Sequence, residues 1–362
     1  MKKSLLALAL GSLFAGSAFA QSSVTLYGIV DQSVRYTTNS DAANHSQVQL
    51  TNGAVTNSRW GLKGSEALGN NLKAIFQLEN GFDPDTGRAN QSNRLFGRQA
   101  YVGLSGDFGA IKLGRQYTEG FNFFGDYDPL TIGNYTANAW PFFLTKFRND
   151  NVISYSGSFQ GLSVGASYGF GEAPGSFTKG TATTNSYWGA RASYETGPFG
   201  FGGVYQEVRD QAGNKQQMWG AAGKVGFGAA KLFAGYIGGK DRTGSLDTTD
   251  WLNARAYTGG GTQNAQANPR KDTIGYIGLT YQATPALALT GVFYGDHIKN
   301  KNGVADNGGN RYTGVLLAEY SLSKRTQVYG TVDFNKVTGG VQTELPGKNN
   351  QTGVAAGIRH IF

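Results

Sequence analysis

Apolar and polar side chains alternate along most of this chain, and a period of two is typical of β-strands that bury one face. In residues 72–79, for example, Leu72, Ala74, Phe76 and Leu78 share one face, opposite a face that carries Lys73, Gln77 and Glu79. Helical periodicity is almost absent, so the pattern predicts an all-β fold. Sixteen such runs are recognisable, at about 23–36, 56–66, 71–82, 94–105, 109–116, 150–159, 161–171, 185–195, 199–209, 216–227, 229–240, 271–282, 286–298, 310–322, 325–335 and 351–362.

The connections between these runs alternate in length. One set consists of tight turns of a few residues, rich in Gly, Asn, Asp and Pro. The other set is long, and spans residues 37–55, 83–93, 117–149, 172–184, 241–270, 299–309 and 336–350. Short turns on one rim and long loops on the other are typical of a transmembrane, antiparallel up-and-down β-barrel.

A closed barrel also satisfies the backbone. Peptide groups in hydrocarbon have no water to bond, so every strand needs a partner on both sides. A barrel of about sixteen strands encloses water, whereas side chains would fill one of about eight. The alternative is a soluble β-sandwich or two tandem all-β domains; the loop rhythm, the terminal aromatic residue and the absence of a linker argue against it.

The first twenty residues have the features of a secretory signal peptide. Lys2 and Lys3 precede a short apolar run, and Ala18-Phe19-Ala20 is an A-x-A cleavage site. We therefore expect residues 1–20 to be cleaved, leaving 21–362 as one barrel domain. After residue 20 no run of about eighteen apolar residues appears, so a helical membrane span is not expected.

Composition narrows the possible functions. The chain has 55 glycines, no cysteine and three histidines (His45, His297 and His360), so no thiolate metal site can form and no catalytic triad is apparent. Loss of Lys2 and Lys3 lowers the formal net charge from +8 to +6. Because the basic residues are dispersed, a nucleic-acid partner is not expected. We predict neither an enzyme, nor a cofactor, nor a bound metal.

Several segments resemble the general porins of Gram-negative bacteria, particularly the β-proteobacterial type. The resemblance covers nearly the whole chain after residue 20 and is carried by SSVTLYGIVD, SRWGLKGSEALGNNLKAIFQLENGF, GRQAYVGLSGDFGAIKLGRQYT, NVISYSG and GIRHIF. It implies a sixteen-stranded barrel in the outer membrane, surrounded by lipid, a homotrimer, and a third long loop folded into the pore. It also implies that the barrel-assembly machinery recognises Phe362.

The connection 117–149 is the candidate for the inward, pore-constricting loop, because its Phe and Trp content is unusual for an exposed rim. Basic residues of the wall can be chosen by parity. If Trp60 and Leu62 face outward, then Arg59 and Lys63 face the lumen. Lys73, out of phase with Phe76, and Arg148, just before its strand, are also expected to face inward.

Arg98 matches the family's GRQ motif, yet it shares phase with the apolar residues Ala100, Val102 and Leu104. Either a bulge resets that strand or Arg98 lies at a subunit interface. By resemblance, Glu119, Asp126 and Asp128 of the loop are expected to face the basic wall. Asp128-Pro129 is also a good start for a turn, so a purely structural role stays open.

These features predict a water-filled channel for passive diffusion of small hydrophilic solutes and ions, with a weak preference for anions. The alternative is a solute-specific channel on the same barrel, with the loop aromatics forming a path for sugars. The long loops also leave open an additional role as an adhesin or phage receptor.

Overall fold

The computed structural model describes residues 22–133, 135–171, 185–247 and 265–362. Within these residues, seventeen strand segments form a single antiparallel sheet. The strands are β1 Ser23–Thr37, β2 Gln47–Asn52, β3 Arg59–Gly69, β4 Leu72–Gly81, β5 Gln99–Gly106, β6 Gly109–Tyr117, β7 Arg148–Phe159, β8 Leu162–Gly169, β9 Tyr187–Thr196, β10 Phe199–Arg209, β11 Lys215–Phe227, β12 Ala230–Asp241, β13 Arg270–Gln282, β14 Leu287–Lys299, β15 Gly309–Ser321, β16 Thr326–Val337 and β17 Asn350–Ile361. Short helical segments lie between them: α2 Asn90–Asn93, α3 Glu119–Tyr127, α4 Thr136–Ala139, η1 Trp140–Thr145, η4 Lys301–Gly303 and η5 Gly339–Glu344.

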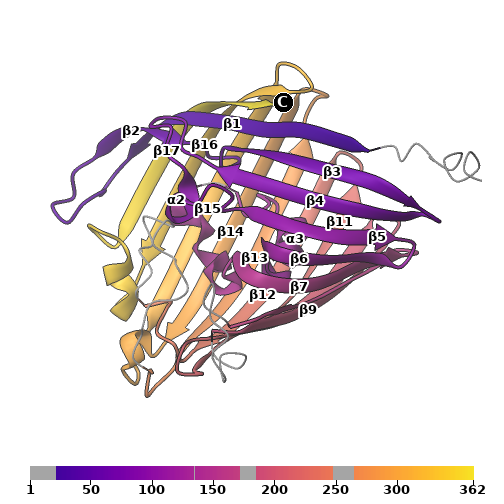
Figure 1. Cartoon of the computed structure of the whole chain (residues 1–362). Helices are drawn as coiled ribbons and strands as arrows, with labels where there is room; N and C mark the ends of the chain where they lie inside the picture. The colour runs from indigo at the N-terminus through magenta and orange to yellow at the C-terminus, as the bar shows by residue number, and fades with distance from the viewer. Residues whose placement is uncertain (1–21, 134, 172–184, 248–264) are drawn as a thin grey trace, which may run out of the picture.

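The sheet closes on itself through β1, which Figure 1 shows between β17 and β3. On one side Ile29 pairs with Ile361 of β17, and on the other it pairs with Arg59 of β3. Because β2 and β3 both pair with β1, they are two segments of one barrel strand. The result is the closed sixteen-stranded antiparallel barrel that the alternating pattern predicts.

The second barrel strand differs from its prediction. The sequence analysis assigned residues 37–55 to a loop, but β2 lies within that span. Residues 53–58 then leave the sheet and turn inward, where buried Asp31 accepts hydrogen bonds from the Thr56 backbone and the Tyr329 hydroxyl at 2.8 and 2.6 Å. Val48 and Leu50 of β2 do alternate with Gln47, Gln49 and Thr51, but this run is short and is separated from β3 by the inward turn, so the sequence analysis assigned it to a loop.

The two faces of the wall differ as the alternation requires. Along β13, Arg270, Asp272 and Ile274 face inward and are buried, whereas Lys271, Thr273 and Ile277 face outward and are exposed.

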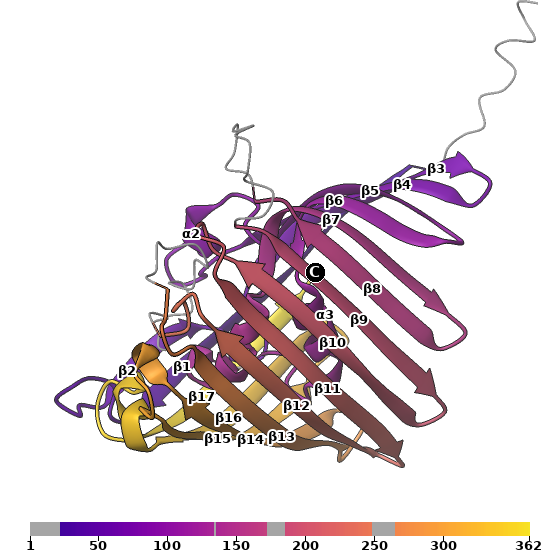
Figure 2. The ribbon, with the colours of Figure 1, turned by 90° about the horizontal axis from the view of Figure 1, so that it is seen from below.

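The rim of tight turns, called here the short-turn rim, carries exposed aromatic side chains on its outer face: Phe108, Phe159, Tyr194, Phe199, Phe227, Tyr281, Tyr320 and Phe362. The opposite end is called the long-loop rim. Figure 2 shows β8 to β12 side by side, with tight turns at one rim. Among the described residues, no helix is both long and apolar enough to cross a membrane.

Candidate functional site

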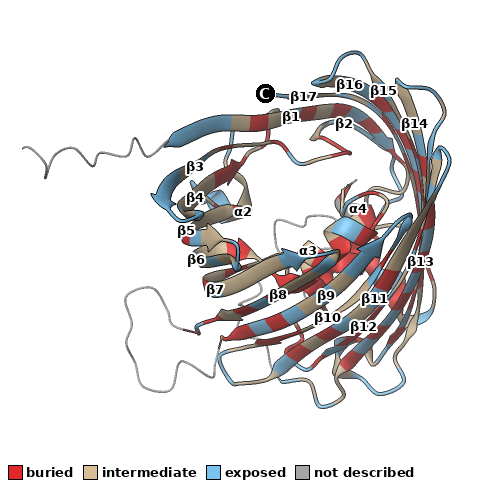
Figure 3. Cartoon of the chain, turned by 90° about the vertical axis from the view of Figure 1, so that its right-hand side faces the viewer, coloured by how far each residue is buried: buried red, intermediate tan, exposed pale blue. Residues whose placement is uncertain are grey.

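A long segment, residues 118–147 between β6 and β7, lies inside the barrel and is called here the inner loop. Figure 3 shows its helices α3 and α4 within the ring of strands. Its aromatic side chains Phe123, Phe124, Phe142 and Phe143 are at most 1% exposed. They pack against the inward faces of β10 to β15 in one apolar cluster, which includes Met218, Tyr276 and Tyr294. The inner loop therefore fills one side of the lumen.

Hydrogen bonds fix the backbone of the inner loop to the wall. The amide of Gln206 on β10 accepts from the Gly120 backbone at 2.9 Å and donates to the carbonyl of Thr145 at 2.8 Å, so one side chain holds both ends of the loop. Farther round, the hydroxyl of Tyr276 donates to the carbonyl of Tyr127 at 3.0 Å. Because these backbone groups have buried side-chain partners, the loop has a defined position.

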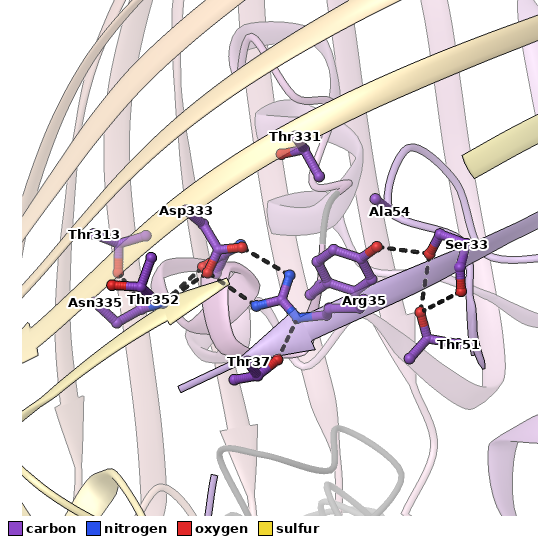
Figure 4. Close-up of polar contacts among 12 residues, drawn as sticks. Ser33, Arg35, Thr37, Thr51, Ala54, Thr313, Thr331, Asp333, Asn335 and Thr352 are labelled. Carbon is purple, nitrogen blue, oxygen red and sulfur yellow. Dashed lines mark hydrogen bonds and ion pairs between the residues drawn. The ribbon is translucent and has the colours of Figure 1, made fainter. Parts of the chain in front are cut away.

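The inner loop also reaches β1 and β16, the region drawn in Figure 4. Arg35 of β1 donates two hydrogen bonds to Asp333 of β16, at 2.7 and 2.9 Å. The Arg35 guanidinium lies over the Tyr135 ring at 3.8 Å, and the Tyr135 hydroxyl bonds Ser33 at 2.6 Å. The inner loop thus covers the wall from β8 round to β1, which we call the covered arc.

The wall from β3 to β7 is the open arc, and its inward residues are strongly basic. Strand register pairs Lys63 with Thr25 and with inward Gln77, and places Lys112 opposite Gly103 and Ser154 on the same face. Only one inward carboxylate, Glu79, is found among the described residues of these five strands. We call this set the basic strip: Arg59, Lys63, Lys73, Arg98, Lys112 and Arg148.

Arg98 is the most tightly held member of the strip. Its side chain is 2% exposed, its Nε donates to Glu79 at 2.7 Å, and its guanidinium donates to the Tyr117 hydroxyl at 2.7 Å. Arg98 lies one residue before β5, and its backbone N–H bonds the carbonyl of Glu79. The strand alternation therefore does not yet apply to Arg98, which explains why parity placed it with the outward residues although its side chain turns inward.

Arg148 and Arg59 lie near Arg98. The guanidinium of Arg148 lies 4.7 Å from the centre of the Tyr117 ring and 5.7 Å from that of Phe121. The Nε of Arg59 donates to the backbone carbonyl of Asn57 at 3.0 Å. Within the described chain, neither arginine forms an ion pair, and neither does Lys63 or Lys112. Lys73 has no ion pair among the described residues either, so five of the six cations of the strip keep an unneutralised charge.

The lysines at the two ends of the strip differ in position. The ammonium of Lys63 is 5.2 Å from the Tyr27 ring. Lys73 lies next to the tight turn that joins β3 to β4, at the short-turn rim and away from the three arginines. Lys112 was missed by the sequence analysis, although parity would have found it, since it alternates with the outward residues Ile111 and Leu113.

The three loop acids are not brought together with the arginines of the open arc. Glu119 is buried and pairs with Arg191 of β9 at 2.9 Å; burial raises its pKa above the usual range. Asp128 is 2% exposed and accepts from the Tyr294 hydroxyl at 2.6 Å and from the backbone of Ile132 at 2.8 Å. Burial raises the pKa of Asp128 to about 6. Of the three, only Asp126 is exposed, and the charged side chains near it, Arg191, Lys224 and Glu195, belong to the covered arc.

The carboxylate that does face the arginines belongs to the wall. Glu79 of β4 bonds Arg98 and also accepts from the Tyr27 hydroxyl at 2.8 Å. The sequence analysis placed Glu79 on the inward face but gave it no role. In the described part of the chain, no group of three or more His, Cys, Asp or Glu side chains could hold a metal ion.

Phe362 closes the barrel seam at the short-turn rim. Its backbone exchanges two hydrogen bonds of 3.0 Å with Gly28. A Cβ at position 28 would come within 2.3 Å of the Phe362 ring, so the ring lies directly on this glycine.

The open arc carries a net positive charge toward the lumen. The basic residues form one wall and the inner loop forms the facing boundary, so a field of fixed sign acts on anything that passes between them.

Comparisons with known proteins agree with this geometry. The model of the Gram-negative porin family matches residues 4–340. An outer membrane porin protein of Bordetella pertussis is 31% identical, and outer membrane porin protein 32 of Delftia acidovorans is 33% identical, each over 100% of both chains. The anion-selective porin from Comamonas acidovorans has a similar structure, with a TM-score of 0.73 and 27% identity over 94% of this chain and 100% of that one. OmpT of Vibrio cholerae, at 14% identity and a TM-score of 0.65 over 94% of this chain and 98% of that one, shares the fold.

Proposed function

Because the chain belongs to the Gram-negative porin family, whose members are outer-membrane β-barrel channels, we propose that its lumen passes small hydrophilic solutes by passive diffusion and weakly prefers anions. The observation that carries this proposal is the basic strip. Arg59, Lys63, Lys112 and Arg148 face the uncovered part of the lumen without forming an ion pair among the described residues. Unneutralised cations on a pore wall raise the local concentration of anions.

The constriction is proposed to lie between the inner loop and the three arginines of the open arc. Phe121 of the loop stacks on Tyr117 at a ring separation of 4.5 Å, directly beside Arg148. This contact brings the loop against the basic strip near the end of β6. Asp126, the exposed loop acid, is the remaining candidate for the opposite side of the constriction.

The test is the double substitution Arg59→Ala with Arg148→Ala. A unit charge about 8 Å from a passing ion contributes roughly 0.5 kcal/mol in water. Each charge favours an anion and disfavours a cation by this amount, and screening in 0.1 M salt reduces it by about half. Removing two should therefore lower the anion-to-cation permeability ratio about fivefold, read as the reversal potential in a potassium chloride gradient. The matched control is Lys324→Ala with Arg325→Ala, which removes two cations at the short-turn rim. An unchanged reversal potential in the first variant would reject the role of the strip.

The solute-specific alternative receives less support. A path for sugars would need aromatic faces exposed along the passage, but Phe123, Phe124, Phe142 and Phe143 are buried against the wall. Block of the open channel that saturates with one class of solute would favour the alternative, whereas exclusion by size alone favours the general pore.

Three further features are proposed from the family resemblance. Residues 1–20, which lie outside the described residues, act as a cleaved signal peptide. Phe362 takes part in recognition by the barrel-assembly machinery. The protein assembles as a homotrimer in outer-membrane lipid. N-terminal sequencing of the exported protein, assembly yield of Phe362→Ala, and the presence or absence of triplet conductance steps test these in turn.

A further inference from the structure

Three lysines form a row on the outer surface of the barrel at the long-loop rim. Lys240 of β12 pairs directly with Lys271 of β13, and Lys271 pairs directly with Lys299 of β14. All three are exposed, and each lies next to a buried inward residue, so their side chains point outward. Adjacent strands are about 4.8 Å apart, so three cations lie within roughly 10 Å.

Like charges directly opposite each other on neighbouring strands destabilise a sheet. The basic residues just beside the row avoid this cost, because Arg209 and Lys215 both pair with Glu207, at 2.8 and 3.2 Å. No such carboxylate pairs with Lys240, Lys271 or Lys299 among the described residues. An anion from outside the chain would supply the missing countercharge.

Below the row, strands β13 to β16, with Leu232 of β12, form an apolar groove on the outer surface. The groove has a volume of about 570 Å³. Its outward apolar lining includes Ile277, Leu279, Phe293, Leu316, Val332 and Phe334. Such a lining suits hydrocarbon chains.

Glycines leave the outer surface between the row and the groove without side chains at several positions. On the outer face Gly275 pairs directly with Gly295, and Gly314 pairs with Phe293 at the groove. A Cβ built at Gly275 or Gly314 would meet no atom within 4 Å, so the space above both is open. A chain can therefore run from the lysines to the groove without meeting a bulky side chain at these positions.

The spacing agrees with the dimensions of one membrane leaflet. Ile277 is six residue steps from Lys271, which is about 20 Å along a strand. Strands tilted by about 45° convert this length into a depth of roughly 14 Å. Half of a hydrocarbon core about 30 Å thick is about 15 Å.

From the lysine row and the groove together, we propose that a phosphate-bearing, multi-acyl lipid of the outer leaflet binds this face, with its phosphates on Lys240, Lys271 and Lys299 and an acyl chain in the groove. The proposal uses the membrane orientation of the barrel, with its long loops outside. It does not depend on the ion preference of the lumen.

The first test measures binding of lipid A, a bisphosphorylated multi-acyl glycolipid, to the detergent-solubilised full-length protein by native mass spectrometry. The variant is Lys240→Gln, Lys271→Gln and Lys299→Gln combined. Each lysine near an anionic lipid headgroup contributes somewhat less than a tenfold factor in affinity, so we expect roughly 100-fold weaker binding. The matched control, Lys324→Gln with Arg325→Gln and Lys348→Gln, removes three exposed cations elsewhere and should bind as the wild type does. Equal binding by the row variant and the wild type would overturn the proposal.

The second test fills the groove with Gly275→Leu and Gly314→Leu, which the open space tolerates. Weaker lipid A binding with unchanged binding of inorganic phosphate supports an acyl-chain site. If inorganic phosphate binds the row as well as lipid A does, the ligand is a free anion and the lipid proposal fails. If the groove variant instead dissociates the native oligomer, this face is a subunit interface and the proposal also fails. Reversal potentials of both variants should match the wild type, which separates this test from that of the lumen.

Discussion

The covered arc and the open arc belong to the same face of the same sheet, yet their arginines differ in whether a carboxylate pairs with them. Under the inner loop, Arg191 pairs with Glu119 and Arg35 pairs with Asp333. On the open arc, Arg59 and Arg148 have no such partners in the described chain. The inner loop itself supplies one of these partners, Glu119, whereas Asp333 belongs to the wall and the Arg35 guanidinium that it binds lies over Tyr135 of the loop. Stability should therefore depend on the covered arc, and selectivity on the open arc.

The largest expected effect is that of Phe124→Ala, which removes a ring of the inner loop that packs on the covered arc. Phe124 is fully buried, and its ring lies 5.8 Å from Phe142 and 6.4 Å from Tyr276. Removing a buried phenyl group costs about 4 kcal/mol, so thermal stability should fall and open-channel current noise should rise as the loop loosens. The control, Phe201→Ala, removes an outward-facing ring that is 56% exposed. Equal stability loss in both variants would mean that the inner loop is not held by this cluster.

A somewhat smaller effect is expected from breaking the buried ion pair between Arg98 and Glu79 on the open arc. Arg98→Ala leaves Glu79 buried without its partner, which costs about 3 kcal/mol. It should also move selectivity toward cations. Combining it with Glu79→Ala should restore part of the stability, since the unpaired carboxylate is then gone. Strictly additive losses in this double-mutant cycle would show that the two side chains do not interact energetically.

The next effect is a pH dependence of the stability of the folded protein, caused by Asp128 of the inner loop. Its pKa of about 6 in the folded loop lies above the usual value of about 3.9 for an unfolded chain. Below about pH 4 the carboxyl is protonated in both states, so the full stability of the folded protein is present. That stability is lost progressively as the pH rises to about 6, because the buried carboxyl must then be ionised. The loss is about 3 kcal/mol, from two pKa units at 1.36 kcal/mol each. Unfolding temperatures between pH 4 and 7 should show this fall, and Asp128→Asn should remove it.

The smallest effect is expected for Lys63→Gln on the open arc. Lys63 is exposed and about 10 Å from a passing ion, where a unit charge contributes roughly 0.4 kcal/mol in water. The anion-to-cation ratio should fall about twofold in 0.1 M salt. The difference should vanish in 1 M salt, because the Debye length shortens from about 10 to 3 Å. A change that persists in 1 M salt would mean that Lys63 shapes the pore rather than its field.

Most of the barrel could be predicted because strand alternation is a local property. Leu62 and Lys63 reveal their faces without knowledge of any partner, and the long-short rhythm of connections gives the topology. The exceptions are places where the chain leaves the sheet. Residues 53–58 turn inward to bond Asp31, and Arg98 precedes its strand by one residue, so parity does not apply to either.

The loop acids illustrate the limit of sequence reasoning. Nothing near Asp128 in the sequence indicates Tyr294, because that contact joins a loop to a strand 166 residues away. The packing of the inner loop against the wall decides it. Glu119 likewise meets Arg191 only because α3 lies along β8 to β10. Charge type and loop identity were predictable, whereas the partner of each charge depends on non-local packing.

The pairing of β1 with β17 has a consequence for how the molecule forms. Ile29 meets Ile361, a contact between segments at nearly maximal separation along the polypeptide. The loop-closure entropy of such a contact must be overcome before any of its hydrogen bonds is gained. Until then β1 and β17 are two open edges that can pair with other chains. We therefore expect this seam to form late in folding, so a refolding assay that follows the Phe362 and Gly28 contact should report the rate-limiting step.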